Sequence, residues 1–361
     1  MATYARRVAV SDLKRRALSS VALAGGALAL AVPAGAQAAF PGANGLIGYS
    51  FSFQPGYIKP VPTTDIRSID VVSPGGRGHQ SLRSCTRVLD AGGAPLEPDR
   101  GDCSIEYLSP AWSPDGKRLA FDAGTRLAVM RSDGTDFRLL AQQTADDGEP
   151  AWSPDGRKLV FTGARGPEPD SGTDLYILDL GSGMLRRLTF GGGRDHSPAW
   201  SSRGRIAFTR GGEVVPPGSG NPFRPGSGNI YTVRPDGRGL RRLTYRNGSD
   251  PAWSPHASKL IFVRGQMVHA AFWRYGLFTV RADGSGLRRV NTPGAGLGAP
   301  GSLPDHPSWS PDGKLIGYHG SLSGVWVQRL DGRGRRQVAT GGASNTIYFD
   351  AVEPDWQPRP R

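Results

Sequence analysis

Short apolar runs alternate with turn-forming residues along most of the chain. In the clearest stretch, an apolar run at residues 109–113 contains Trp112, and Pro114-Asp115-Gly116 follows it. Further runs lie at residues 118–122, 126–131 and 137–141, with Asp133-Gly134 between the last two. An Asp-Gly pair between short apolar runs is typical of tight β-hairpins. The pattern therefore predicts a unit of four antiparallel strands.

This unit recurs along the chain. Six tryptophans each stand two residues after a proline: Trp112, Trp152, Trp200, Trp253, Trp309 and Trp356. Their spacings are 40, 48, 53, 56 and 47 residues, which suits a four-stranded propeller blade with insertions. We therefore predict an all-β, six-bladed β-propeller with four-stranded antiparallel blades. The tryptophans are expected to pack between neighbouring blades.

The two chain ends each supply part of one blade. Residues 44–50 resemble a second strand, but no Trp-containing strand precedes them. The absent first strand occurs at the far end, at residues 353–356. We expect this C-terminal strand to complete the N-terminal blade and close the ring, because closure hides the sheet edges that an open array would expose.

The N-terminus predicts export. Basic residues precede an apolar run at residues 17–32, and Ala36-Gln37-Ala38 forms a small-residue cleavage pattern. This layout is typical of a secretory signal peptide at residues 1–38, followed by a single domain at residues 39–361. The run is short and is broken by Pro33, which disfavours a transmembrane anchor. We predict a monomer in the periplasm, in the cell envelope or outside the cell, with no membrane span after cleavage. Secretory and twin-arginine export both remain open.

Charge and cysteine content refine this picture. The net charge is +13, but five of the positive charges lie in the predicted signal peptide, and arginines recur at equivalent positions of the repeats. This favours a solvated rim over nucleic-acid binding, since no helix carries the basic residues into a groove. The only two cysteines are Cys85 and Cys103. In an oxidising compartment they predict a disulfide; two free thiols are the alternative.

The insertions fall on one face of the predicted ring. The connections between strands two and three lie on that face, as do the connections between blades. They contain the insertions at residues 51–65, 85–103, 162–173, 210–228, 264–274 and 292–304. Variable loops on one face of a rigid repeat scaffold indicate a binding face. Trp273 lies there with Phe272 and Tyr275, and the three could form an exposed recognition patch, fold back onto the rim or start the third strand.

Acidic residues and histidines precede all six inner strands. We predict a ligand-binding ring at the channel mouth from Glu106, Asp146, Asp147, Glu149, Asp195, His196, Asp250, Asp305, His306, Asp350 and Glu353. Such a ring would attract a basic peptide end or a cation such as calcium. The alternative is that these residues cap turns or pair with nearby arginines.

The repeated string resembles that of a known family. Pro-Ala-Trp-Ser-Pro-Asp-Gly followed by two basic residues, Leu, a small apolar residue and Phe occurs at residues 110–121 and 150–161. Leu-Arg-Arg-Leu-Thr occurs at residues 185–189 and 240–244. It resembles the propeller repeat of TolB-like proteins over about residues 44–357. The resemblance implies partner-peptide binding at the channel mouth and, in some members, a metal ion. The small α/β domain that precedes the TolB propeller is expected to be missing.

Three hypotheses of function remain after this comparison. The leading one is a non-catalytic module that binds a protein or peptide at the acidic face. The first alternative is a channel-site, metal-assisted hydrolase, lactonase or lyase using His196 and His306; the second is cell-wall or carbohydrate binding through Trp273. Similar repeats occur in prolyl-oligopeptidase relatives, but the chain has no Gly-x-Ser-x-Gly sequence for such a hydrolase.

Overall fold

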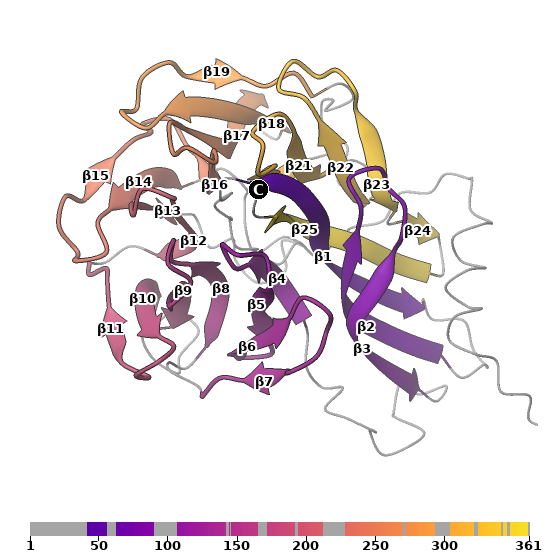
Figure 1. Cartoon of the computed structure of the whole chain (residues 1–361). Coiled ribbons are helices and arrows are strands. Elements are labelled where there is room, and N and C mark those ends of the chain that lie inside the picture. The colour runs from indigo at the N-terminus through magenta and orange to yellow at the C-terminus, as the bar shows by residue number, and fades with distance from the viewer. Residues whose placement is uncertain are drawn as a thin grey trace, which may run out of the picture.

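The protein is a ring of β-sheets around a central channel. The computed structural model describes residues 42–55, 63–89, 107–141, 144, 146–164, 172–191, 194–211, 228–269, 272–292, 304–320, 324–340, 342–344 and 347–359. These residues form six antiparallel sheets, which are the six blades of a propeller, and no helix (Figure 1). The predicted all-β, six-bladed fold is confirmed. The predicted signal peptide and Cys103 lie outside the described residues, so both the export signal and the disulfide stay predictions.

The blades follow the sequence repeat. Blade 2 contains β4 (Tyr107–Trp112), β5 (Arg118–Ala123), β6 (Arg126–Arg131) and β7 (Arg138–Leu139). Blade 3 contains β8 (Asp147–Trp152), β9 (Lys158–Ala164), β10 (Thr173–Asp179) and β11 (Leu185–Arg187). Blade 4 contains β12 (Asp195–Trp200), β13 (Ile206–Arg210), β14 (Asn229–Val233) and β15 (Arg241–Arg242). Blade 5 contains β16 (Ser249–Trp253), β17 (Lys259–His269), β18 (Phe272–Arg281) and β19 (Arg288–Arg289). Blade 6 contains β20 (Asp305–Trp309), β21 (Ile316–His319), β22 (Gly324–Gln328) and β23 (Arg336–Thr340).

Blade 1 combines both ends of the chain, as predicted. Its sheet has the order β24 (Gly342–Ser344), β25 (Ile347–Arg359), β1 (Ala43–Pro55), β2 (Thr63–Val72) and β3 (Gln80–Leu89). The C-terminal strand β25 pairs with β1 over its whole length, from Ala43 opposite Arg359 to Pro55 opposite Ile347. The sheet therefore closes the ring with the strand that the N-terminal repeat lacks. The short strand β24 is an addition to the four strands expected.

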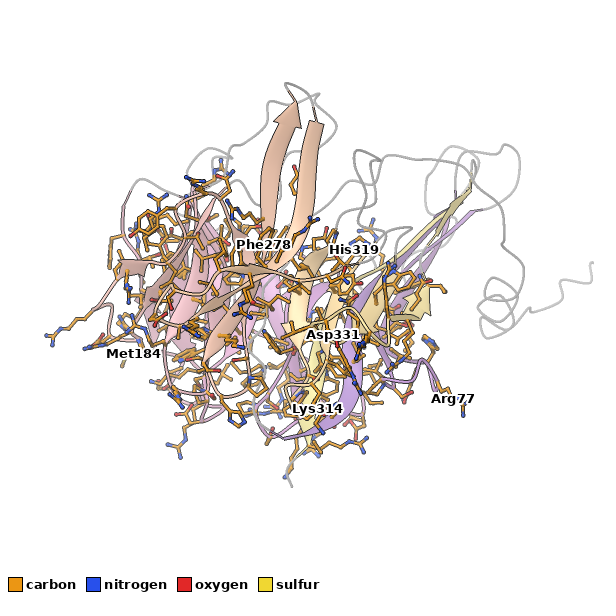
Figure 2. The ribbon with its side chains drawn as sticks, turned by 90° about the horizontal axis from the view of Figure 1, so that it is seen from above. Arg77, Met184, Phe278, Lys314, His319 and Asp331 are labelled. Atoms are coloured by element: carbon orange, nitrogen blue, oxygen red, sulfur yellow. The ribbon has the colours of Figure 1, made fainter. Side chains whose placement is uncertain are left out.

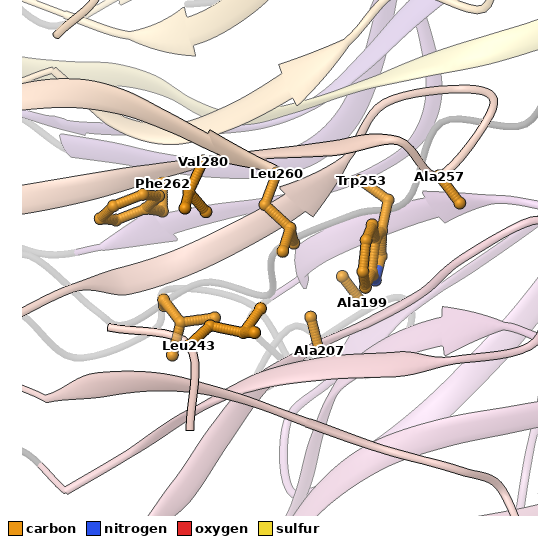
Figure 3. Packing of buried hydrophobic residues seen from close by; sticks show 9 residues of the cluster. Ala199, Ala207, Leu243, Trp253, Ala257, Leu260, Phe262 and Val280 are labelled. Atoms are coloured by element: carbon orange, nitrogen blue, oxygen red, sulfur yellow. The ribbon is translucent and has the colours of Figure 1, made fainter. Parts of the chain in front are cut away.

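The hydrophobic core lies between the blades, as six separate clusters with one at each junction. At the junction of blades 4 and 5, Trp253 and Leu260 of blade 5 face Ala199 and Leu243 of blade 4 (Figure 3). Large rings set against small side chains fill such a junction at high density. The inner-strand tryptophans are thus inter-blade core residues, as the sequence indicated.

Several of the recurring arginines link neighbouring blades along the outer rim. Arg241 Nη2 of blade 4 donates to the carbonyl oxygen of Asp283 in blade 5 at 2.7 Å. Arg336 Nη2 of blade 6 donates to the carbonyl oxygen of Pro74 in blade 1 at 2.8 Å. Arg186 of blade 3 makes the same type of contact with Pro235 of blade 4. The basic repeat positions therefore have a structural use in addition to solvation.

The two faces of the ring differ. We call the end with the turns between strands one and two and between strands three and four the short-turn face; Lys314 lies there (Figure 2). The opposite end, near His319, is the long-loop face. There β17 and β18 continue past the ring as one hairpin, paired from Lys259 opposite Arg281 to His269 opposite Phe272 (Figure 2). The predicted insertion at residues 264–274 is largely this hairpin, and its aromatic residues begin the third strand.

Candidate functional site

In blades 2 to 6, each inner strand is irregular three residues before its tryptophan. There the backbone adopts a positive φ and the register with the second strand shifts. Since residues other than glycine rarely adopt positive φ, its recurrence marks a feature of the scaffold. All of these positions carry polar side chains: Ser109 (φ 51°), Glu149 (φ 55°), Ser197 (φ 51°), Asp250 (φ 53°) and His306 (φ 48°).

Four of these residues join blades 2 to 5 through a buried hydrogen-bond network. In blade 2, Ser109 Oγ donates to Asp122 Oδ2 at 2.8 Å. The backbone N–H of Glu149 in blade 3 donates to Asp122 Oδ1 at 2.7 Å. Ser197 in blade 4 donates its backbone N–H to Glu149 Oε2 at 2.6 Å and its hydroxyl to Asp250 Oδ1 in blade 5 at 3.0 Å. The carboxylates at these positions therefore bind neighbouring blades to one another.

Glu149 is the central acceptor of this network. Its Oε2 also accepts a hydrogen bond from the Thr162 hydroxyl at 2.5 Å. Burial raises the pKa of the Glu149 carboxyl and nearby Asp250 adds to the rise, whereas the charge of His196 and the donors Thr162 and Ser197 oppose it. A buried carboxylate with fixed donors is costly to disturb, because removing it leaves those donors without an acceptor.

The first residue of the inner strand in blade 4 is held by an arginine. Asp195 Oδ1 and Oδ2 accept hydrogen bonds from Arg210 Nε and Nη2, each at 2.6 Å. The contact raises the pKa of the Arg210 guanidinium. The corresponding Asp147 of blade 3 accepts from the Thr144 hydroxyl at 2.5 Å. These two acids therefore have fixed partners within their own blade or the connection that leads into it.

Blade 6 has imidazoles where blade 4 has a guanidinium. The register places Asp305 opposite His319, and Asp305 Oδ1 lies 2.7 Å from His319 Nδ1 and 3.1 Å from His306 Nδ1. Burial opposes ionisation of Asp305, but the charge and hydrogen bonds of the two imidazoles hold the pKa of its carboxyl well below its usual range. A carboxylate and two imidazoles thus meet at the long-loop end of the channel wall.

The structure divides the predicted site residues into groups. Glu149, Asp195, Asp250 and Asp305 are buried and have protein partners, Asp147 is buried, and Asp146 is exposed. His196 is half-buried and its Nδ1 lies 3.0 Å from Ser197 Oγ. Glu106 lies outside the described residues. Asp350, Glu353 and Trp273 lie on strands β25 and β18, but their side chains are outside the described part of the structure.

Sequence reasoning missed several residues of this site. Asp122 and His319 lie at the ends of second strands, Ser197 occupies a bulge position, and Asp355 accepts the backbone N–H of Trp112 at 2.7 Å. The strand register could have identified His319, because the last residues of the second strand pair with the first residues of the inner strand.

The donor set decides which cation the site can take. Calcium prefers six to eight oxygen ligands, but the oxygens of Glu149 and Asp250 accept hydrogen bonds from protein donors. Bound calcium would have to displace these contacts. His196 and His306, the metal-ligand or acid/base candidates of the enzyme hypothesis, lie in different blades with different partners. Among the described residues, one cluster can offer three metal-ligating atoms, and it consists of Asp305, His306 and His319.

Parts of this chain match a family profile and a curated relative. The profile of the TolB beta propeller domain matches residues 101–214, which span blades 2 and 3 and the first half of blade 4. An uncharacterised protein of Agrobacterium fabrum is 30% identical over 149 residues, covering 40% of this chain and 46% of that protein, so the match spans about half the relative's length.

Solved structures agree on the architecture. The crystal structure of TolB from Acinetobacter baumannii matches with a TM-score of 0.58 at 20% identity, over 86% of this chain and 67% of that one. A chain of the nidogen/laminin complex matches with a TM-score of 0.52 at 13% identity, over 84% and 98%. At such identities the likeness shows the fold alone.

The fold and site define a closed six-bladed propeller with one plain face and one elaborated face. Within that class, residues 101–214 match the TolB beta propeller domain, and the fold of the chain is similar to that of TolB. The described part of the chain contains no helix that is long and apolar enough to cross a membrane.

Proposed function

We propose that this chain is an exported, non-catalytic propeller that binds a protein or peptide ligand on its long-loop face. The observation that carries the proposal is the hairpin of β17 and β18, which extends past the ring on the long-loop face (Figure 2). An edge that projects beyond a rigid scaffold offers backbone and side-chain groups to a partner.

The contrast with the short-turn face supports this proposal. There the turns are compact and internally satisfied: Asp115 Oδ1 accepts from the Ser113 hydroxyl at 2.6 Å and from the Lys117 N–H at 3.1 Å. Asp155 and Asp312 make the same pair of contacts in blades 3 and 6. Groups that complete their own turn have little left for a ligand, so the long-loop face is the better candidate.

The acidic mouth contributes less than its composition suggests. Glu149 and Asp250 link neighbouring blades, and Asp195 is paired with Arg210 within blade 4. Asp146 is exposed and His196 is half-buried. The proposed contacts are therefore the hairpin, Asp146 and His196. The resemblance to TolB-like propellers supports a protein or peptide as the ligand, and the predicted signal peptide supports an exported location. Carbohydrate binding through Trp273 stays a prediction.

A hairpin-shortened variant tests the proposal. Gly265 and Tyr275 are paired across the hairpin, so residues 266–274 can be replaced by Asn-Gly, which favours a two-residue turn. The mature protein, with a photo-crosslinking residue in the hairpin, is incubated with the envelope and culture fractions of its native cells, and adducts are identified by mass spectrometry. We then expect the purified partner to bind the shortened variant at least roughly tenfold more weakly.

The matched control changes the short-turn face. Lys314→Ala and Asp331→Ala alter exposed turn residues and should leave partner binding and melting temperature unchanged. Full binding by the shortened variant, or equal loss in the control, would refute the assignment of the ligand to the long-loop face.

A further inference from the structure

Two blades offer a comparison of the same strand position within one molecule. In blade 4, Asp195 pairs across the sheet with Arg210; in blade 6, Asp305 pairs across the sheet with His319. An arginine is always charged, whereas an imidazole is neutral near pH 7 unless a partner stabilises its proton. Neutral imidazole is also a good ligand for transition metals. The substitution therefore replaces a permanent cation with groups that can hold an added one.

The geometry in blade 6 brings the required atoms together. One ligand atom from each of Asp305, His306 and His319 lies within 4.8 Å of the other two. The side chains are 9%, 9% and 15% exposed. The two imidazole planes are inclined by only 23°, with ring centroids 6.5 Å apart. The three groups thus form a compact, mostly buried set.

The backbone contributes to this convergence. His306 occupies the positive-φ bulge position, with φ 48°, at which Glu149, Ser197 and Asp250 take part in the hydrogen-bond network. The bulge shifts the register between Asp305 and Ser308. A regular strand would direct the consecutive residues Asp305 and His306 to opposite faces of the sheet. The bulge instead brings both of them to the same group on the second strand.

We propose that Asp305, His306 and His319 form a binding site for a divalent transition metal of the zinc type. Two imidazole nitrogens and one carboxylate oxygen are a common protein ligand set for zinc, whereas calcium prefers oxygen alone. A tetrahedral zinc ion at ordinary bond lengths separates its ligand atoms by about 3.3 Å. The present separations of 2.7 and 3.1 Å from Asp305 Oδ1 are shorter than this, so small outward movements would admit the ion as it replaces protons on nitrogen.

Three protein ligands leave one position of a tetrahedral shell for water or for an anionic group of a ligand. The site lies at the long-loop end of the channel, since Asp305 begins β20 and His319 ends β21. This proposal does not depend on partner binding through the hairpin, and the two can fail separately.

Zinc binding to the purified mature protein tests the site. The protein, free of any affinity tag, is stripped with a chelator and dialysed against zinc, and bound metal is measured by elemental analysis and calorimetry. We expect one zinc per chain and a melting temperature that rises with zinc concentration, because a ligand of the native state stabilises it. Cobalt in place of zinc should give the intense visible absorption of a four-coordinate site.

The variants locate the metal. His319→Asn and His306→Asn should each weaken zinc binding at least roughly tenfold, whereas His256→Asn should not, because His256 is an exposed residue in a turn of the short-turn face. Circular dichroism confirms that each variant is folded. A wild-type protein that takes up no zinc refutes the site even if the variants do not fold. Equal zinc binding by wild type and both variants, or loss in His256→Asn, would also overturn it.

Discussion

The polar groups at the start of the inner strands differ between blades 2 to 5 and blade 6. In blades 2 to 5, carboxylates and serines at the bulge positions bind the next blade, and Asp195 has a fixed cation in Arg210. In blade 6, the corresponding chemistry is titratable: Asp305 faces two imidazoles. Blade 1 is itself assembled from both chain ends. The comparison teaches that one backbone scaffold can carry either a rigid structural network or groups that respond to protons and metals.

The largest effect is expected at the closure of the ring. Removing residues 350–361 deletes Trp356 and most of β25, so β1 loses its inner partner and blade 1 its core. We expect loss of cooperative unfolding throughout the propeller, measured by calorimetry and circular dichroism. Removal of residues 360–361 alone, which follow β25, is the matched control and should leave the melting temperature unchanged. A longer truncation that melts like the parent would show that closure is not required.

The fixed ion pair of blade 4 should come next. Arg210→Met leaves the Asp195 carboxylate, only 1% exposed, without its cation. Breaking a buried pair in this way costs about 3–5 kcal/mol in the free energy of unfolding, which urea denaturation would measure. The double variant Asp195→Asn with Arg210→Met should regain most of that loss. In metal-free protein, His319→Asn in blade 6 should cost less, about 1–2 kcal/mol, because a hydrogen bond is removed and not a permanent charge.

The network of blades 2 to 5 should be sensitive at its centre. Glu149→Ala removes the acceptor of the Thr162 hydroxyl and the Ser197 N–H. Buried donors left without acceptors cost about 1–3 kcal/mol, so we expect a loss of about 2 kcal/mol in the free energy of unfolding. Asp146→Ala, three residues earlier and exposed, should change stability by less than about 0.5 kcal/mol. Equal effects of the two substitutions would mean that the network does not stabilise the ring.

A smaller, pH-dependent effect is expected where blade 1 meets blade 2. Burial raises the pKa of Asp355 to about 7, although the N–H groups of Trp112 and Trp356 favour the charged form. The folded state therefore retains a proton that the unfolded chain releases near pH 4. The resulting stability is fully present below that pH and is lost as pH rises through about 7.

Asp355→Asn isolates this contribution, because the amide oxygen can still accept from the Trp112 N–H. The free energy of unfolding of the wild type minus that of the variant should fall by on the order of 2 kcal/mol between pH 5 and 8. Denaturant titrations over that range measure the difference. The exposed Asp331→Asn should give a flat difference, and an equally flat profile for Asp355→Asn would refute the raised pKa.

The sequence predicted the blades well because their signals are local. In blade 2, runs at residues 118–122 and 126–131 correspond to β5 (Arg118–Ala123) and β6 (Arg126–Arg131). The inner strand of blade 2 was placed slightly too late, at residues 109–113, whereas β4 begins at Tyr107. The bulge explains this error, since a polar residue with positive φ at Ser109 conceals the strand that continues through it.

The site was predicted only in part. Acidic residues and histidines near the channel were identified, but their partners were not. The sequence pattern suggested a shared carboxylate ring, whereas the structure divides it into a network around Glu149, an ion pair at Asp195 and an imidazole cluster at Asp305. His319 and Asp122 gave no repeat signal of their own, because the ends of second strands vary from blade to blade.

By itself, the sequence determined the number of blades, the order of the strands, the closure by the C-terminal strand and the inter-blade position of the tryptophans. Repeated hydrophobic and turn residues suffice for these features, since each blade repeats one local pattern. Only the tertiary structure decided which polar groups meet. Ser197 and Glu149 are 48 residues apart, and Trp112 and Asp355 are 243 residues apart. Such contacts depend on strand register, bulge direction and ring closure, which together choose one partner among many similar polar residues.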